Sequence, residues 1–157
     1  MLWKLGQVVA QLTSTDCGAE LRRFAETTGI PVFANSKGQG LLAHDHPNNA
    51  GAPGGLAVLG MMGLQRPDVV LLLGARMGEV PSAGYTLIDI PQPQQLLVHA
   101  LPEAQDLGHL YRPDLALLAT MPELARAFAV TDPRKRARSW LATAPLPPET
   151  KAKLTGK

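Results

Sequence analysis

Short apolar runs recur along the chain, and they are separated by segments whose apolar residues are spaced as in helices. The most apolar run is 69–73, where five consecutive apolar residues lie between Pro67 and Gly74. Five residues are too few for an independent helix, and a continuous apolar run is typical of a strand buried on both faces. The pattern therefore predicts a central strand of a parallel sheet that is covered by helices.

The other elements follow from the same two periodicities. Further apolar runs predict strands at 7–12, 30–33, 96–101 and 115–119. Helical spacing and helix-start residues predict helices at 17–28, 54–65, 103–110, 121–130 and 133–140. Because strands that alternate with helices form βαβ units with right-handed crossovers, we expect an α/β fold. The expected architecture is a doubly wound, mostly parallel sheet with helices on both faces, which is a three-layer, Rossmann-like arrangement.

Residues that begin and end helices support several of these boundaries. Thr120-Met121-Pro122-Glu123 combines an N-cap, a proline in the first helical turn and a glutamate at N3, which is a capping box. Ser14-Thr15-Asp16 offers N-caps for the first helix, and Gly29 suits the position after its end. We expect residues 1–143 to form a single α/β domain and residues 144–157 to form a linker or tail.

The carboxyl end of the predicted central strand is the first candidate for a ligand site. In open α/β sheets, ligands bind in the crevice beyond the carboxyl ends of the strands. The turn Gly74-Ala75-Arg76 leaves the strand at this point. A small residue permits close approach of a ligand, and an Arg can offer a planar fork to phosphate. The simpler interpretation is an ordinary strand that is followed by a solvated Arg.

Composition narrows the function classes. The chain has 157 residues, of which 45% are hydrophobic, so one domain with a substantial core is expected. A net charge of +2 and an aromatic content of 4% argue against nucleic acid as a partner. The single cysteine, Cys17, cannot form an internal disulfide, so we expect a buried thiol in a reducing cytoplasm. No apolar run approaches the roughly 20 residues that span a bilayer, so no membrane association is expected.

His44-Asp45-His46 is the segment that most resembles a metal or acid–base cluster. Two loop residues at i and i+2 can both ligate a metal, but a third ligand would have to come from His99, His109 or a distant carboxylate. A loop-structuring role is therefore the favoured interpretation, and a small hydrolase that uses His44 or His46 is the least favoured function. The sequence has no nucleophile elbow, zinc-protease motif or P-loop, and nothing in it supports catalysis unaided.

Four segments, taken in order, carry a family resemblance. Residues 18–32 resemble the "ELAEKTGIPV" segment of the thiamine diphosphate-dependent enzymes, and residues 37–47 resemble their "KG…PEDHP". Residues 67–76 look like "ADLVLVLGARF", and residues 97–108 resemble "IHIDIDPAEIGR". The likeness covers roughly residues 18–130 and points to the middle domain of this family, with acetolactate synthase-like enzymes as the nearest relatives.

The chain also departs from the family pattern. The family's acidic "DID" element is represented by Ala100-Leu101, and its "GD" by Ala119-Thr120. In flavin-binding members of the family, several of the positions in these segments line FAD. The family's thiamine diphosphate and magnesium are held by an activating Glu and a "GDG…NN" segment in two other domains, which this chain does not contain. We therefore expect an isolated or truncated middle domain of a 2-oxo-acid enzyme, structural and nucleotide-binding but not catalytic alone. The alternative is a stand-alone nucleotide- or FAD-binding protein of the same fold.

The expected ligand site and partners follow from this resemblance and from the fold. FAD or ADP, if either binds, should lie across the carboxyl ends of the strands, where helix N-termini present free N–H groups to phosphate. The candidate residues are Asn35, Ser36, Lys37, Gly54, Gly55, Gly74, Ala75, Arg76, Ala119 and Thr120. The expected partners are the flanking thiamine-binding domains or a second copy of the chain. An exposed apolar patch would favour a homo-oligomer, and its candidate residues are Leu2, Trp3, Met61, Met62 and Trp140.

Overall fold

The computed structural model describes residues 7–10, 17–52, 67 and 69–129. Several sequence predictions concern residues outside these ranges. They are the helices at 54–65 and 133–140, the tail at 144–157, the candidate ligand residues Gly54 and Gly55, and the proposed apolar patch.

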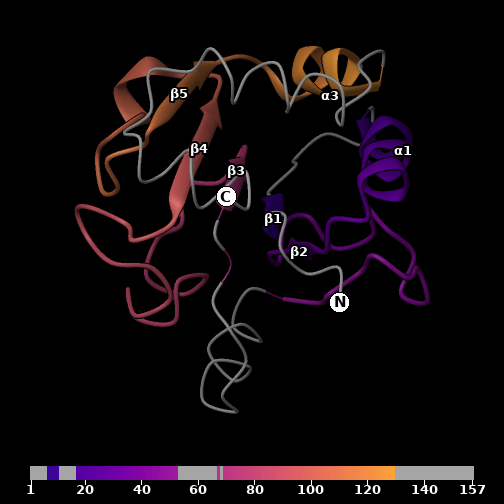
Figure 1. Ribbon diagram of the computed structural model, residues 1–157, viewed down its shortest axis with the longest axis horizontal. Coiled ribbons are helices and arrows are strands. Elements are labelled where there is room, and N and C mark those ends of the chain that lie inside the picture. Colours follow the sequence, from indigo (N-terminus) through magenta and orange to yellow (C-terminus); the bar gives the residue numbers. More distant parts are fainter. Residues whose placement is uncertain (1–6, 11–16, 53–66, 68, 130–157) are drawn as a thin grey trace, which may run out of the picture.

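Five parallel strands form one open sheet (Figure 1). They are β1 (Gln7–Ala10), β2 (Val32–Ala34), β3 (Val69–Leu73), β4 (Leu96–Leu101) and β5 (Leu115–Leu118). Their order in the sheet is β2-β1-β3-β4-β5, and every neighbouring pair is parallel. This is one of the two common doubly wound orders: β2 lies on one side of β1 and the later strands follow on the other side, so the strand order reverses between β1 and β3. The predicted parallel α/β fold is confirmed.

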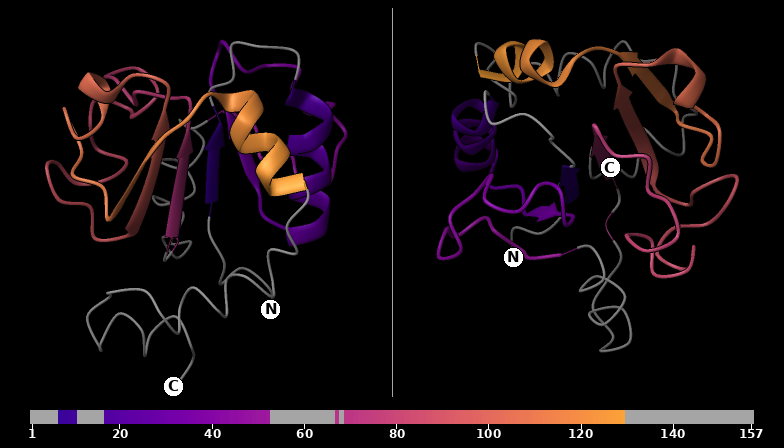
Figure 2. Two further views of the ribbon diagram at one scale, coloured as in Figure 1. Left: turned by 90° about the horizontal axis from the view of Figure 1, so that it is seen from above. Right: turned by 180° about the vertical axis from the view of Figure 1, so that it is seen from behind.

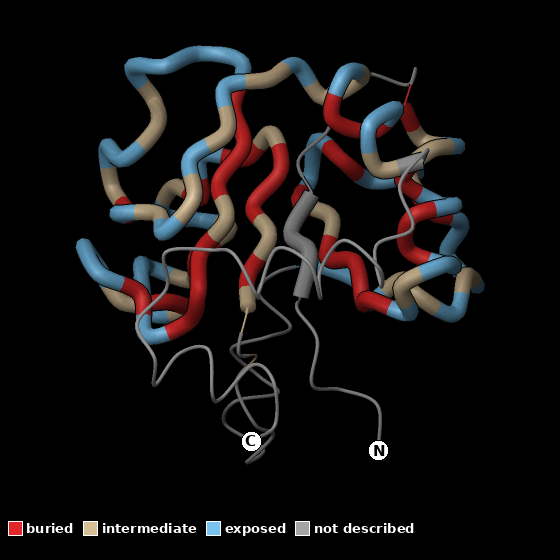
Figure 3. The backbone as a smooth tube through the Cα atoms, turned by 45° about the horizontal axis from the view of Figure 1, so that its top comes forward, coloured by how far each residue is buried: buried red, intermediate tan, exposed pale blue. Residues whose placement is uncertain are grey.

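Strand β3 lies at the centre of the sheet, as its apolar run predicts. Leu72 is opposite Val9 of β1 on one side and His99 of β4 on the other. Its side chain is fully buried, and Leu73 is almost fully buried, whereas Leu71 is half-buried. In Figure 3, most residues of β3 and β4 are buried, whereas many residues of the connections are exposed. The core of the domain is therefore built around β3.

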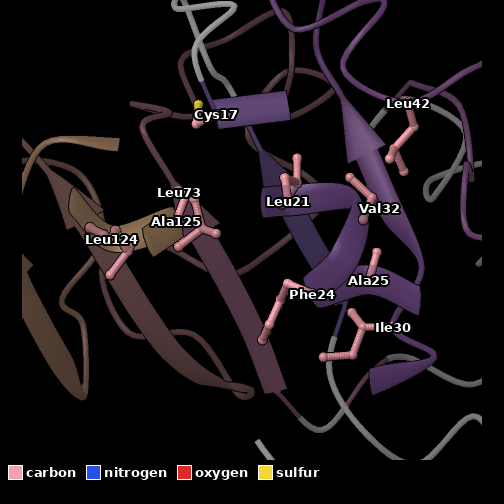
Figure 4. Close-up of a cluster of buried hydrophobic side chains, with 11 residues drawn as sticks. Cys17, Leu21, Phe24, Ala25, Ile30, Val32, Leu42, Leu73, Leu124 and Ala125 are labelled. Carbon is pink, nitrogen blue, oxygen red and sulfur yellow. The ribbon is translucent and has the colours of Figure 1, made fainter. Parts of the chain in front are cut away.

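Both described α-helices cover the same face of the sheet (Figure 2, left). Helix α1 (Gly18–Thr28) lies beside α3 (Met121–Ala129), and the rings of Phe24 and Phe128 stack with their centroids 4.6 Å apart. Leu21, Phe24 and Ala25 lie on the buried side of α1, at the spacing predicted from the sequence (Figure 4). An aromatic pair of this kind contributes about 0.5–1.5 kcal/mol beyond the burial of its area. These contacts fix both helices against one another.

The opposite face carries irregular chain in the part that the structure describes. A second group of buried side chains lies there: Phe33, Val70, Leu72, Ala75, Met77, Ile88, Leu97 and Tyr111. The helix predicted at 103–110 is wrong in extent, because only the 3₁₀ turn η2 (Ala104–Asp106) forms. Leu107 is already extended, and Gly108 has a positive φ of 76°. The segment also lacks a buried apolar stripe, so no packing stabilises a longer helix.

The two ends of α1 agree only in part with the sequence predictions. Gly29 adopts the left-handed conformation, with a φ of 72°, and its N–H donates to the Ala25 carbonyl at 2.8 Å. This confirms the predicted glycine at the end of the helix. At the other end the N-cap is Cys17, with no capping side-chain bond, rather than one of the residues 14–16. Cys17 is fully buried, which confirms the buried thiol.

Candidate functional site

The predicted ligand segments that the structure describes lie at one edge of the sheet. Because all five strands are parallel, their carboxyl ends share an edge, where 35–37 follow β2, 74–76 follow β3 and 119–120 follow β5. Strands β2 and β5 are the two outermost strands, four spacings or about 19 Å apart. Residues 74–76 follow β3, which borders the point where the strand order reverses. This point is the usual ligand position in such sheets. Only an extended ligand could touch all three segments.

Asn35 organises the turn that follows β2. Its side chain is buried, and its Oδ1 accepts hydrogen bonds from the backbone N–H groups of Lys37 at 3.1 Å and Gly38 at 3.2 Å. The side chains of Ser36 and Lys37 are exposed at the rim of the sheet. Asn35 therefore shapes the turn, and Lys37 is the charged group of this segment that faces solvent.

The turn after β3 is tied to the neighbouring strand β4. Gly74 has a φ of 65°, and its N–H donates to the Ala100 carbonyl at 2.9 Å. Ala75 is buried, and its carbonyl accepts a hydrogen bond of 2.8 Å from His99 Nε2. A positive φ suits glycine, since residues with a Cβ atom are strained there. These bonds place Arg76 at a fixed point on the edge.

The Arg76 side chain projects to the surface but is held by two carboxylates. Its Nη2 lies 2.6 Å from Asp106 Oδ2 and 3.6 Å from Glu103 Oε2, both on the connection between β4 and β5. The Arg76 side chain is 67% exposed, and that of Asp106 is 22% exposed. The guanidinium predicted to meet phosphate is thus already paired within the chain.

His99 borders a small cavity beside this pair. The cavity is about 60 Å³ and is lined by Arg76, His99, Asp106, His109, Leu110 and Tyr111. Since a carbonyl only accepts, the His99–Ala75 bond places the ring proton on Nε2 and leaves Nδ1 as an acceptor. Nδ1 is buried and has no hydrogen-bond partner among the described residues. In the sequence, His99 is only one of several possible third metal ligands, although a polar residue inside an apolar strand is a usable signal of a special role.

Burial lowers the pKa of His99 below its ordinary value of 6.5, although the bond to Ala75 and the charge of Asp106 act in the opposite direction. Below pH 6.5 the unfolded chain therefore takes up a proton at this residue before the folded chain does. We expect the free energy of unfolding to decrease as the pH falls from 6.5 towards the lowered pKa. His99→Gln keeps a donor for Ala75 but cannot titrate.

Chemical denaturation between pH 5 and pH 8 tests this expectation. The free energy of unfolding should depend less steeply on pH in His99→Gln than in the unmodified protein, specifically below about pH 6.5. Identical pH dependences of the two proteins would contradict a buried neutral His99.

Thr120 and Glu123 close the amino end of α3. Glu123 Oε2 accepts hydrogen bonds from the Thr120 hydroxyl at 2.6 Å and from the Thr120 backbone N–H at 3.0 Å. These two bonds lower the pKa of the Glu123 carboxyl. The glutamate half of the predicted capping box is confirmed, but the threonine hydroxyl donates to Glu123 instead of accepting from the helix backbone. A carboxylate of the chain therefore already lies at this helix N-terminus.

The His44-Asp45-His46 segment structures its loop. His46 Nε2 lies 3.2 Å from Glu26 Oε1 of α1, and its Nδ1 accepts a hydrogen bond from the Asn48 N–H at 3.1 Å. Asn48 in turn donates to the Ile30 carbonyl at 3.1 Å. The loop-structuring role is thus confirmed for His46. Within the described ranges, no group of three or more His, Cys, Asp or Glu side chains is placed to hold a metal ion.

A larger cavity beside β2 was not anticipated from the sequence. It measures about 400 Å³ and lies between β2 and the loop that follows it. Val32, Leu41 and Leu42 contribute apolar surface, and Gln39, His44 and Asn49 contribute polar groups. Only the folded path of residues 39–52 brings these side chains together.

The sequence was compared with known families and curated proteins. Residues 9–128 match the family described as the central domain of thiamine pyrophosphate enzymes, thiamine pyrophosphate being another name for thiamine diphosphate. The acetolactate synthase large subunit of Corynebacterium glutamicum is 29% identical over 122 residues, which are 76% of this chain and 19% of that protein. The acetolactate synthase of Mycobacterium avium is 27% identical over 119 residues, 71% of this chain and 19% of that protein.

The chain therefore spans about a fifth of the length of these curated relatives. Among the helices that the structure describes, none has both the length and the apolar character to cross a bilayer.

Proposed function

The chain belongs to the family of thiamine pyrophosphate enzyme central domains, and from this premise we propose that it is the structural, nucleotide-binding middle domain of an enzyme that acts on 2-oxo acids. The observation that carries the proposal is the family match over residues 9–128, which includes strands β2 to β5 and the last two residues of β1. The similarity to acetolactate synthases supports 2-oxo acids as the substrates of the complete enzyme. The flanking thiamine-binding domains are the proposed partners of this domain.

The proposed nucleotide position is the carboxyl edge of the sheet near β3. It is supported by the reversal of strand order between β1 and β3 and by Gly74 in the left-handed conformation, which lets a ligand approach the backbone closely. Lys37 and Arg76 are cations at this edge that could approach phosphate groups. ADP and FAD are the proposed ligands. A stand-alone flavin protein of the same fold is not favoured by any of these observations.

The described residues do not fit thiamine diphosphate and magnesium. The magnesium that anchors a diphosphate requires a cluster of oxygen ligands, and the described side chains form no cluster of acidic or histidine groups able to hold a metal. We therefore propose that this domain is not catalytic by itself, and that thiamine diphosphate and magnesium are bound by other domains of the complete enzyme. A homo-oligomer stays a prediction.

Calorimetric titration of the purified chain tests the proposal. We expect no saturable heat with thiamine diphosphate and magnesium, and saturable binding of ADP or FAD. Mass spectrometry of molecules released from the denatured protein provides an independent check on a retained nucleotide. Saturable thiamine diphosphate binding would refute the noncatalytic assignment, and the absence of any nucleotide binding would refute the nucleotide site.

A further inference from the structure

The environment of Arg76 differs from that of an open phosphate site. Its guanidinium contacts Asp106 at 2.6 Å and Glu103 at 3.6 Å, and both carboxylates come from the segment that follows β4. With both carboxylates ionised, this group of three side chains carries a net charge of −1. A phosphate that approaches Arg76 would therefore meet two like charges at close range, where Coulomb repulsion is largest.

The fold holds Asp106 in place for this contact. In the turn η2, the Asp106 N–H donates to the Glu103 carbonyl at 3.2 Å, and the Leu107 N–H donates to the Ala104 carbonyl at 3.2 Å. Asp106 is also the less exposed partner, because its side chain is 22% exposed against 67% for Arg76. Because the chain tethers this carboxylate beside the guanidinium, its effective concentration there is high. A free anion in solution has to compete with it for Arg76.

The cavity behind the pair leaves little room for an additional anion. At about 60 Å³ it holds only a few water molecules, and Arg76 and Asp106 both form its walls. Among the described residues that line this cavity, the buried side-chain atom without a partner is Nδ1 of His99, an acceptor that offers no hydrogen to a phosphate oxygen. A phosphate that approaches Arg76 from this side therefore meets the Asp106 carboxylate beside the guanidinium.

We propose that Asp106 determines the anion specificity of this edge: its carboxylate occupies Arg76 and thereby opposes the binding of phosphate groups. Glu103 plays the lesser part, since it lies 1.0 Å farther from the guanidinium, at 3.6 Å against 2.6 Å. This inference rests on the nucleotide position proposed above and concerns which ligands that position accepts. Any phosphate bound by the unmodified chain then binds in competition with Asp106.

Titration with inorganic pyrophosphate, which needs no adenine or flavin pocket, tests the inference. Asp106→Asn should bind pyrophosphate at least fivefold more tightly than the unmodified chain, and Glu103→Gln should show a smaller gain. The gain should disappear in the double variant Asp106→Asn/Arg76→Ala, because the released cation is then absent. Asp45→Asn removes the same charge from the exposed loop before His46 and should leave the affinity unchanged. Thermal unfolding of each variant confirms that it is folded.

Several results of these titrations would overturn the proposed role of Asp106. Equal affinities of Asp106→Asn and the unmodified chain would overturn the inference, as would a complete lack of pyrophosphate binding by the folded Asp106→Asn variant. A gain that persists in the double variant, or that also occurs in Asp45→Asn, would show a general charge effect and would overturn it as well. ADP titrated separately tests the proposed function. ADP binding that is insensitive to Asp106 leaves the nucleotide site intact and refutes only the role of Asp106.

Discussion

Replacement of Leu72 by alanine is expected to lower the free energy of unfolding by about 3–5 kcal/mol, the upper part of the range for large-to-small changes in cores. Leu72 is fully buried at the centre of β3 and belongs to the buried cluster on the face opposite the α-helices. The substitution removes apolar contacts and leaves a cavity. Because neighbouring strands are hydrogen-bonded on both sides of β3, the site cannot collapse easily.

Urea denaturation followed by circular dichroism measures this loss. Leu118→Ala is the matched control, since it is the same substitution on strand β5 at a side chain that is 62% exposed. We expect the control to change the free energy of unfolding by less than about 1 kcal/mol. Similar losses in the two variants would show that β3 is not the centre of the core.

Replacement of Arg76 by alanine is expected to weaken ADP binding tenfold or more. Arg76 is 67% exposed in the free chain, so the bound nucleotide itself has to shield the charge-assisted hydrogen bond from water. Such a shielded bond contributes about 1.5–3 kcal/mol, and about 1.4 kcal/mol corresponds to one decade in affinity. The loss has a second cause in this structure. Without the guanidinium, Asp106 and Glu103 face the incoming phosphate uncompensated.

Calorimetric titration with ADP compares this variant with Arg22→Ala. Arg22 is exposed on α1, so its replacement changes the net charge equally without touching the proposed site. Affinity in the control should stay within twofold of the unmodified chain. If Arg76→Ala binds ADP as tightly as the control does, Arg76 plays no part in the site.

Much of the fold could be predicted because burial imposes local patterns. The apolar run at 69–73 predicted β3 within its observed bounds, since a strand covered on both faces tolerates few polar residues. The spacing of Leu21, Phe24 and Ala25 predicted the buried side of α1 for a similar reason. The family resemblance also came from the sequence alone and is confirmed by the match over residues 9–128.

The candidate site was predictable only in outline. The carboxyl ends of parallel strands must share an edge, so Asn35, Arg76 and Thr120 could be assigned to that edge before the structure was known. The hydrogen-bond and ion-pair partners of these side chains could not be assigned from the sequence. Asn35 bonds its own turn, Arg76 pairs with Asp106, and Thr120 bonds Glu123.

The sequence by itself determined the strands, the principal helices and the family, because each depends on residues that are close in the chain or on recognisable segments. Tertiary structure decided the strand order, the short η2 in place of a helix, and the pairing of Arg76 with Asp106. It also decided that Nδ1 of His99 lies buried as an acceptor without a partner in the described part of the chain. These features depend on contacts between segments that are distant in the chain. Whether a charged group or a ring nitrogen has a partner is decided only when the connections that follow neighbouring strands pack against one another.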